Sequence, residues 1–128
     1  MRTKTLVVIS CSIEAATGLA LVAVPNLVAS LLLGAGLPAS GEAVARVGGL
    51  GLFSLALACW PRGEGDIQQP VRALFVYNLA AAFYLAYLKV GGEFTSLLLL
   101  PASGLHALLG ALLVRPVYWS VVDRGGIT

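Results

Sequence analysis

Charged residues are scarce in this 128-residue chain. Only 11% of its residues are Asp, Glu, Lys or Arg and 59% are hydrophobic, whereas soluble domains carry about 25% charged residues. A soluble domain is therefore excluded. The formal net charge of +2 is small, and Lys and Arg do not cluster as nucleic-acid binding requires. We expect the bilayer to be the main partner and nucleic acid not to be one.

Cysteine and histidine are nearly absent. Cys11 and Cys59 lie inside hydrophobic stretches and are too few for a disulfide framework, so we predict buried free thiols. His106 is the only histidine, which leaves a metal site within one chain short of nitrogen ligands. We predict no metal, except that His106 would ligate the iron if a haem were held between two chains.

Catalytic signatures are missing as well. The sequence has no GxSxG elbow, HExxH pair, P-loop or dinucleotide-binding fingerprint. Serine residues are present, so a Ser–His nucleophile is not excluded, but no spacing favours one. We favour a non-catalytic protein over an enzyme, and the sequence leaves the identity of any cofactor unknown.

The sequence does contain four long apolar segments. Each is close to the roughly 20 residues that a helix needs to cross the hydrocarbon core. They cover residues 5–24, 43–60, 70–88 and 95–114, and short polar or Gly/Pro-marked stretches separate them. No linker is long enough to divide the chain into two domains. We predict an all-α polytopic membrane protein, with residues 1–128 forming a single domain and a four-transmembrane-helix bundle.

A shorter apolar stretch follows the first segment. If one helix ran from residue 5 to residue 33, it would measure about 43 Å, longer than the hydrocarbon core of about 30 Å. We expect Pro25 to turn the chain and Gly34 to end the stretch. The sequence therefore predicts a short interfacial helix over residues 26–33.

Small residues recur every four positions in the predicted spans. In lipid, helices associate by close van der Waals contact, which small side chains permit. We expect such residues to form the helix contacts, among them Ser12, Ala16 and Ala20, Ala45 and Gly49, and Ser103, Ala107 and Ala111.

Lys and Arg are distributed unevenly between the two sides of the predicted bundle. Lys89 alone lies in the loops of one side, and Arg46 lies about one turn inside the second segment. The others share the opposite side: Arg2, Lys4, Arg62, Arg72, Arg115 and Arg124. By the positive-inside rule, we predict a multi-pass protein of the inner (plasma) membrane with both termini cytoplasmic.

Glu14 and His106 lie deep in predicted spans. Counted from the ends of their segments, both are about 15 Å into the bilayer and thus at one level. Arg46 enters from the outer side, with a stem long enough to reach toward Glu14. A charge at the bilayer centre costs on the order of 3 kcal/mol, so such groups should face the interior and find partners.

Two interpretations of these groups stay open. Glu14 and Arg46 form either a structural ion pair that docks two helices or part of a ligand or proton site. His106 is either a neutral imidazole hydrogen-bonded to Glu14, Asn78 or a helix carbonyl, or a proton-relay group or haem ligand.

The third segment adds aromatic and amide groups near the same level. Tyr77 and Tyr84 are seven residues apart and thus share a face. Such a stripe suits a pocket for an apolar ligand, but aromatic residues at helical spacing are more often simply packing. The candidate ligand-binding or relay residues are Glu14, Arg46, Tyr77, Asn78, Tyr84 and His106.

The sequence resembles small bacterial four-helix inner-membrane proteins, the group that includes the DoxX-like family. The resemblance lies in Val24-Pro25, in residues 26–34 that follow, and in the run from Ala45 to Gly49. That group includes subunits of membrane oxidoreductase complexes. The resemblance implies an accessory or quinone-linked membrane subunit.

Three functions follow as hypotheses. The first is a non-catalytic inner-membrane protein that acts as an accessory subunit or binds a small apolar ligand through an intramembrane polar centre. The second is a haem- or quinone-binding redox subunit, and the third is a proton-coupled transporter or channel. Besides the bilayer, the expected partners are a homo-oligomer or larger membrane complex, and a quinone, lipid or other apolar ligand.

Overall fold

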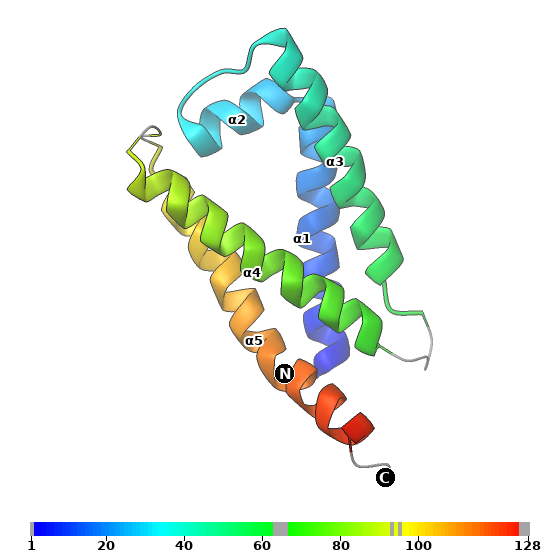
Figure 1. The fold of residues 1–128 in the computed structure, drawn as a ribbon. Coiled ribbons are helices and arrows are strands. Elements are labelled where there is room, and N and C mark those ends of the chain that lie inside the picture. The colour runs from blue at the N-terminus through cyan, green and yellow to red at the C-terminus, as the bar shows by residue number, and fades with distance from the viewer. Residues whose placement is uncertain (1, 63–66, 93, 95, 126–128) are drawn as a thin grey trace.

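Within residues 2–62, 67–92, 94 and 96–125, which the computed structural model describes, the chain folds into five helices (Figure 1). They are α1 (Thr3–Ala23), α2 (Pro25–Leu33), α3 (Ala39–Cys59), α4 (Gln68–Val90) and α5 (Leu99–Gly125). Four stretches are long and apolar enough to cross a membrane: α1, α3, α4 and Leu99–Trp119 of α5. The predicted all-α fold, with four spans and a short helix after the first, is confirmed.

The spans pack as two pairs. α1 lies along α3 and α4 lies along α5, whereas contacts between the pairs are sparser. The pairs cross obliquely, meet near the N-terminus and the α3–α4 connection, and diverge toward α2 (Figure 1).

The apolar core lies at the end where the pairs meet. Every span contributes buried side chains to it, so this core joins the two pairs. Its members are Leu6, Val7 and Cys11 of α1, Ala56 and Cys59 of α3, Val71 and Leu74 of α4, and Leu109 and Leu113 of α5. The prediction of buried free thiols is confirmed, because Cys11 and Cys59 are both buried and unbridged.

Gly18 and Gly49 form the close crossing of α1 and α3. A Cβ built on Gly18 would lie 2.7 Å from the carbonyl oxygen of Gly49, and one built on Gly49 would lie 2.6 Å from that of Gly18. No side chain fits between backbones this close. Gly49 was among the small residues expected at helix contacts, but Ser12 and Ala16 of the predicted stripe on α1 are exposed.

The chain turns between α1 and α2 as Pro25 predicts. Val24 leaves helical geometry (φ −137°, ψ 57°), and Pro25 opens α2, which runs crosswise to α1 (Figure 1). Gly34 ends α2 at φ 80°, a left-handed conformation that favours glycine. The amide of Leu37 then donates to Oδ1 of Asn26 at 2.9 Å, which holds the following loop against α2. The placement of α2 at a membrane surface stays a prediction.

The bounds of all four spans differ from those predicted, by one or two residues at each end of α1 and α4 and by more in α3 and α5. α3 begins at Ala39 rather than at residue 43, since the extended Pro38 directly precedes it. The predicted start of the last span, residue 95, lies outside the described residues. α5 begins at Leu99, because the Ser96 hydroxyl accepts from the amide of Leu98 at 3.2 Å and donates to the carbonyl of Leu31, which holds this stretch in a turn.

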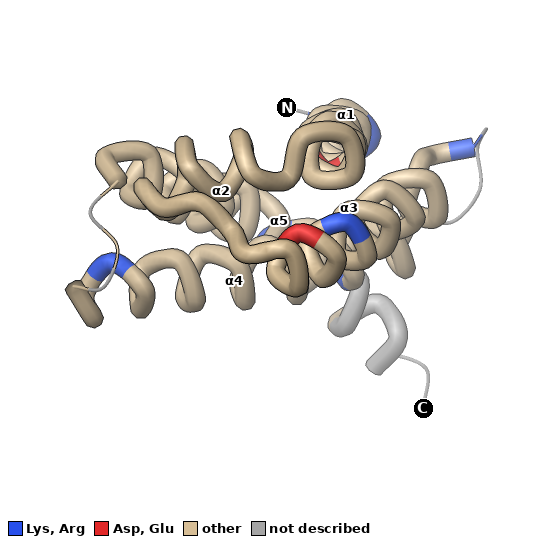
Figure 2. Tube along the Cα trace, turned by 90° about the horizontal axis from the view of Figure 1, so that it is seen from above, with Lys and Arg blue, Asp and Glu red and all other residues tan. Residues whose placement is uncertain are grey.

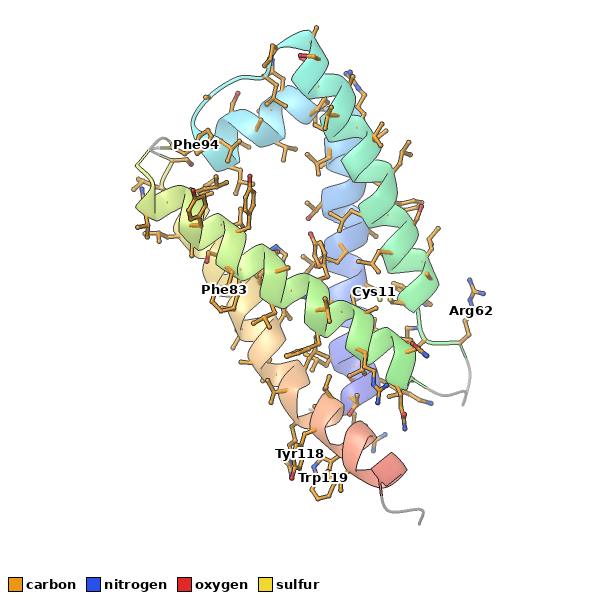
Figure 3. The ribbon with its side chains drawn as sticks, viewed as in Figure 1. Cys11, Arg62, Phe83, Phe94, Tyr118 and Trp119 are labelled. Atoms are coloured by element: carbon orange, nitrogen blue, oxygen red, sulfur yellow. The ribbon has the colours of Figure 1, made fainter. Side chains whose placement is uncertain are left out.

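α5 also continues past its predicted end at residue 114. It runs through Pro116 to Gly125, although a proline inside a helix removes one backbone hydrogen bond. Tyr118 and Trp119 project from this part, near the same end of the molecule as Arg62 (Figure 3), and their rings meet edge to face with centroids 6.1 Å apart. Aromatic and basic side chains thus share one end, as the predicted topology requires; which side of the membrane that end faces stays a prediction.

We expect Gly49→Ala to destabilise the protein by about 1–3 kcal/mol, as overpacking does, because the new Cβ would meet backbone atoms of α1 that cannot move aside. Thermal unfolding in detergent measures the change. Gly104→Ala of α5 is the matched control, since nothing lies within 4 Å of a Cβ there and alanine favours helix. Equal melting temperatures for the two variants would contradict the crossing.

Candidate functional site

A group of polar side chains lies next to the apolar core, on the side where the helix pairs diverge. Glu14 is one turn beyond the core residue Cys11 on α1, and Asn78 is one turn beyond Leu74 on α4. We define the polar centre as Ser10, Glu14, Tyr77, Asn78 and His106. Of the candidates predicted from sequence, the structure thus brings together Glu14, Tyr77, Asn78 and His106.

Asn78 determines which nitrogen of His106 carries the proton. Its Nδ2 donates to the carbonyl of Leu74 at 2.8 Å, so its Oδ1 is the atom that lies 2.9 Å from Nδ1 of His106. An amide oxygen only accepts hydrogen bonds, so Nδ1 must donate. In the neutral ring, Nε2 is then left as an acceptor.

Tyr77 contacts the same imidazole ring from α4. The two rings meet edge to face, with centroids 5.7 Å apart and an interplanar angle of 80°. The Tyr77 hydroxyl also interacts with the Glu14 carboxylate, but the contact is not close or aligned enough to satisfy either carboxylate oxygen. Tyr77 and Asn78 therefore orient the ring, which stands beside Glu14.

Glu14 is fully buried but lacks hydrogen-bond partners. Its side chain is 1% exposed, against 14% for His106, and its Oε1 lies 3.9 Å from Nδ1 of His106, beyond hydrogen-bond distance. Within the described part of the chain, neither carboxylate oxygen has a hydrogen bond. A buried polar group without a partner costs about 1–3 kcal/mol, and more if it is charged.

Ser10 belongs to the polar centre, although sequence reasoning did not select it. It is fully buried one turn before Glu14, and its hydroxyl has no partner among the described residues. Other hydroxyls in the spans do have acceptors. Ser12 donates to the carbonyl of Val8 at 2.8 Å, and Thr17 donates to that of Ile13 at 2.9 Å. The spacing of one turn from Glu14 was the signal that could have identified it.

Arg46 does not reach the polar centre. Its Nη2 pairs with Glu42 at 3.3 Å, and its Nε donates to the carbonyl of Val22 at 3.3 Å, about 12 Å along α1 from Glu14. Because α3 begins earlier than predicted, Glu42 is helical and one turn before Arg46, a favourable spacing for an ion pair; the acidic and basic segments adjoin on α3 (Figure 2). The predicted pair with Glu14 is not formed.

Tyr84 is also outside the polar centre. It is 62% exposed, although its spacing of seven from Tyr77 keeps the two on one side of α4 to within about 20°. The Tyr84 side chain is exposed, whereas the Tyr77 ring is in contact with His106 of α5. One face of α4 is thus covered at Tyr77 and open at Tyr84.

His106 is the residue of the polar centre best suited to an iron or another metal. Nδ1 is engaged by Asn78, so ligation would use Nε2. Among the described residues, no group of three or more His, Cys, Asp or Glu side chains is arranged to hold a metal ion. A haem bound through His106 therefore stays a prediction, and it would need further ligands from outside this set.

Comparison of the chain with protein-family models, curated proteins and solved structures gave no match in any of the three. The resemblance to the DoxX-like group is therefore supported only at the level of four candidate spans with a short helix after the first. No residue role is carried over from a relative, and the function is inferred from the polar centre.

The proton position on His106 is directly testable, because ¹⁵N-histidine labels one ring in this chain. We expect NMR of the protein in detergent near neutral pH to show a protonated Nδ1 and an unprotonated Nε2. Asn78→Ala removes the acceptor and should give a mixture of tautomers, whereas Asn26→Ala, outside the polar centre, should not. A wild-type ring protonated at Nε2 alone would refute the assignment.

Proposed function

We propose that this chain is a non-catalytic membrane protein that binds a small, mainly apolar molecule, with the polar end of that molecule in the polar centre. The observation that carries the proposal is the buried Glu14 carboxylate, which has no hydrogen-bond partner among the described residues. Buried polar groups are nearly always paired, and lipid offers no replacement. A ligand that donates to Glu14 supplies the missing partner.

The position of the polar centre supports this role. It lies one helical turn beyond the apolar core through which the two helix pairs meet. Contacts between the helix pairs are sparser than contacts within them, so the pairs separate more easily than either pair comes apart. His106 forms the accessible edge, and the exposed Tyr84 lies further along α4, where it would contact the apolar part of the ligand.

An accessory role in a homo-oligomer or larger membrane complex is part of the proposal. Gly48 and Gly51 of α3 have open space around them, and the neighbouring Val44 and Val47 are among the most exposed side chains. Such a surface allows close approach of another helix in lipid.

Proton-coupled transport is the second candidate function. The observation that favours it is the 3.9 Å distance between Oε1 of Glu14 and Nδ1 of His106, which a small side-chain movement would close to hydrogen-bond length. Intramembrane carboxylate and histidine pairs of this kind serve as proton relays.

The binding proposal predicts a bound molecule that depends on Glu14. Gentle purification in detergent followed by mass spectrometry should find a small molecule in stoichiometric amount with the wild type. Glu14→Gln, which cannot carry the charge, should lose it. Glu42→Gln makes the same chemical change outside the polar centre and should retain it. Equal retention by all three proteins, or none by the wild type, would count against the proposal.

Stability separates a binding role from a structural one. If Glu14 serves a ligand, replacing it by an apolar side chain relieves an unpaired buried group. Ligand-free Glu14→Leu should then be as stable as the wild type, or more stable by about 1–2 kcal/mol. A structural role for Glu14 in joining the helix pairs predicts a lower melting temperature instead, which thermal unfolding in detergent would reveal.

The relay function predicts proton flux through the protein. Liposomes with an imposed potassium-diffusion potential and an internal pH-sensitive dye should acidify faster with wild-type protein than with Glu14→Gln or His106→Ala. Flux that is the same in all three would remove this candidate.

A further inference from the structure

We infer that the ligand of the polar centre carries a protonated amine on an apolar body. The inference rests on the proposed binding function and adds the chemical class of the ligand. Two observations on the described residues support it: the polar centre contains hydrogen-bond acceptors that have no donor, and Glu14 has no lysine or arginine side chain beside it.

Most of the unused capacity consists of acceptors. Both amide atoms of Asn78 are engaged, by Leu74 and by His106. The atoms left over are the two oxygens of Glu14 and the hydroxyl of Ser10, together with Nε2 of His106, an acceptor in the tautomer that Asn78 imposes. A partner for this set must bring several N–H or O–H groups, and an ammonium group brings three.

The charge of the polar centre also indicates a cationic ligand. The basic residue predicted to neutralise Glu14 is Arg46, which is held by Glu42 and by the end of α1. Within the described residues, the ion contact of Glu14 is with His106 alone, at 3.9 Å. A carboxylate in the bilayer needs a counter-charge, and an ammonium group provides one while also donating to both oxygens.

Ligands whose polar end only accepts fit less well. The carbonyl groups of a quinone need donors, and the unpaired buried donor here is the hydroxyl of Ser10. A carbonyl or carboxylate placed among these groups would also face the oxygens of Glu14 and be repelled. The apolar body follows from the surroundings, since the exposed ring of Tyr84 lies further along α4 from Asn78, where it would contact that body.

Four probes with similar bodies test the ligand class: phenethylamine, phenylethanol, phenylpropionate and dimethoxy-methyl-benzoquinone. Each is titrated into detergent-purified protein at a pH where the amine is protonated, and the readouts are the melting temperature and the ¹⁵N signals of His106. We expect phenethylamine to raise the melting temperature saturably and to shift the Nε2 signal. Phenylethanol should bind at least about tenfold more weakly, as expected when a charge-assisted hydrogen bond is lost.

Three variants test whether the response to phenethylamine arises from binding at the polar centre. The response to phenethylamine should vanish in Glu14→Gln, weaken in Ser10→Ala and persist in Glu42→Gln. If Glu14→Gln does not fold, the Ser10→Ala titration and the Nε2 shift in the wild type carry the test. An equal response in Glu14→Gln and the wild type would mean non-specific partition and would overturn the inference.

The remaining outcomes separate this inference from the proposed function. A Glu14-dependent response to the quinone or to phenylpropionate, without one to the amine, overturns the amine class and leaves a binding protein. No response to any probe, while a copurified molecule is present, also overturns only the class. No response and no copurified molecule overturn both.

Discussion

The close contact of two backbones at Gly18 and Gly49 is the interaction on which the arrangement of the spans depends. In lipid, apolar side chains gain little by leaving their surroundings, so helices are held by tight packing. The crossing sets the distance between α1 and α3 and makes them one pair. α4 and α5 form the second pair, and the two join through a core confined to one end. Because this core lies at one end only, the two pairs diverge toward the other end, where α2 lies (Figure 1).

The polar centre stands at the boundary that this arrangement creates. Elsewhere in the spans, hydroxyl groups such as those of Ser12 and Ser54 are satisfied by carbonyls of their own helices, so they need nothing from a neighbouring helix. Ser10 and Glu14 are different, because they are buried against the second pair and lack partners in the described structure. Under the proposed function, these unpaired groups are the ones that bind the ligand.

Much of this could be predicted from the sequence, since length and hydropathy locate helices that must satisfy their own backbones in lipid. Depth counting also placed Glu14 and His106 at one level, and the structure brings them together. Arg46 could not be placed, because its partner depends on where α3 begins, and helix ends are weakly encoded. Tyr84 could not be placed either, since its exposure depends on where the pairs diverge, a tertiary property that helical spacing does not contain.

The polar centre combines residues from both halves of the chain, and this affects how the protein is inserted into the membrane. Each helix pair is formed by consecutive spans, so α1 and α3 can associate in the membrane while α4 and α5 are still being synthesised. Glu14 then enters the bilayer long before Asn78 and His106 exist. The insertion machinery must accept this acidic residue on the strength of the apolar residues around it, and the cost is on the order of 3 kcal/mol. α1 has the highest hydropathy of the four candidate spans. Its apolar residues therefore offset the cost of inserting Glu14 before its neighbours in the polar centre have been synthesised.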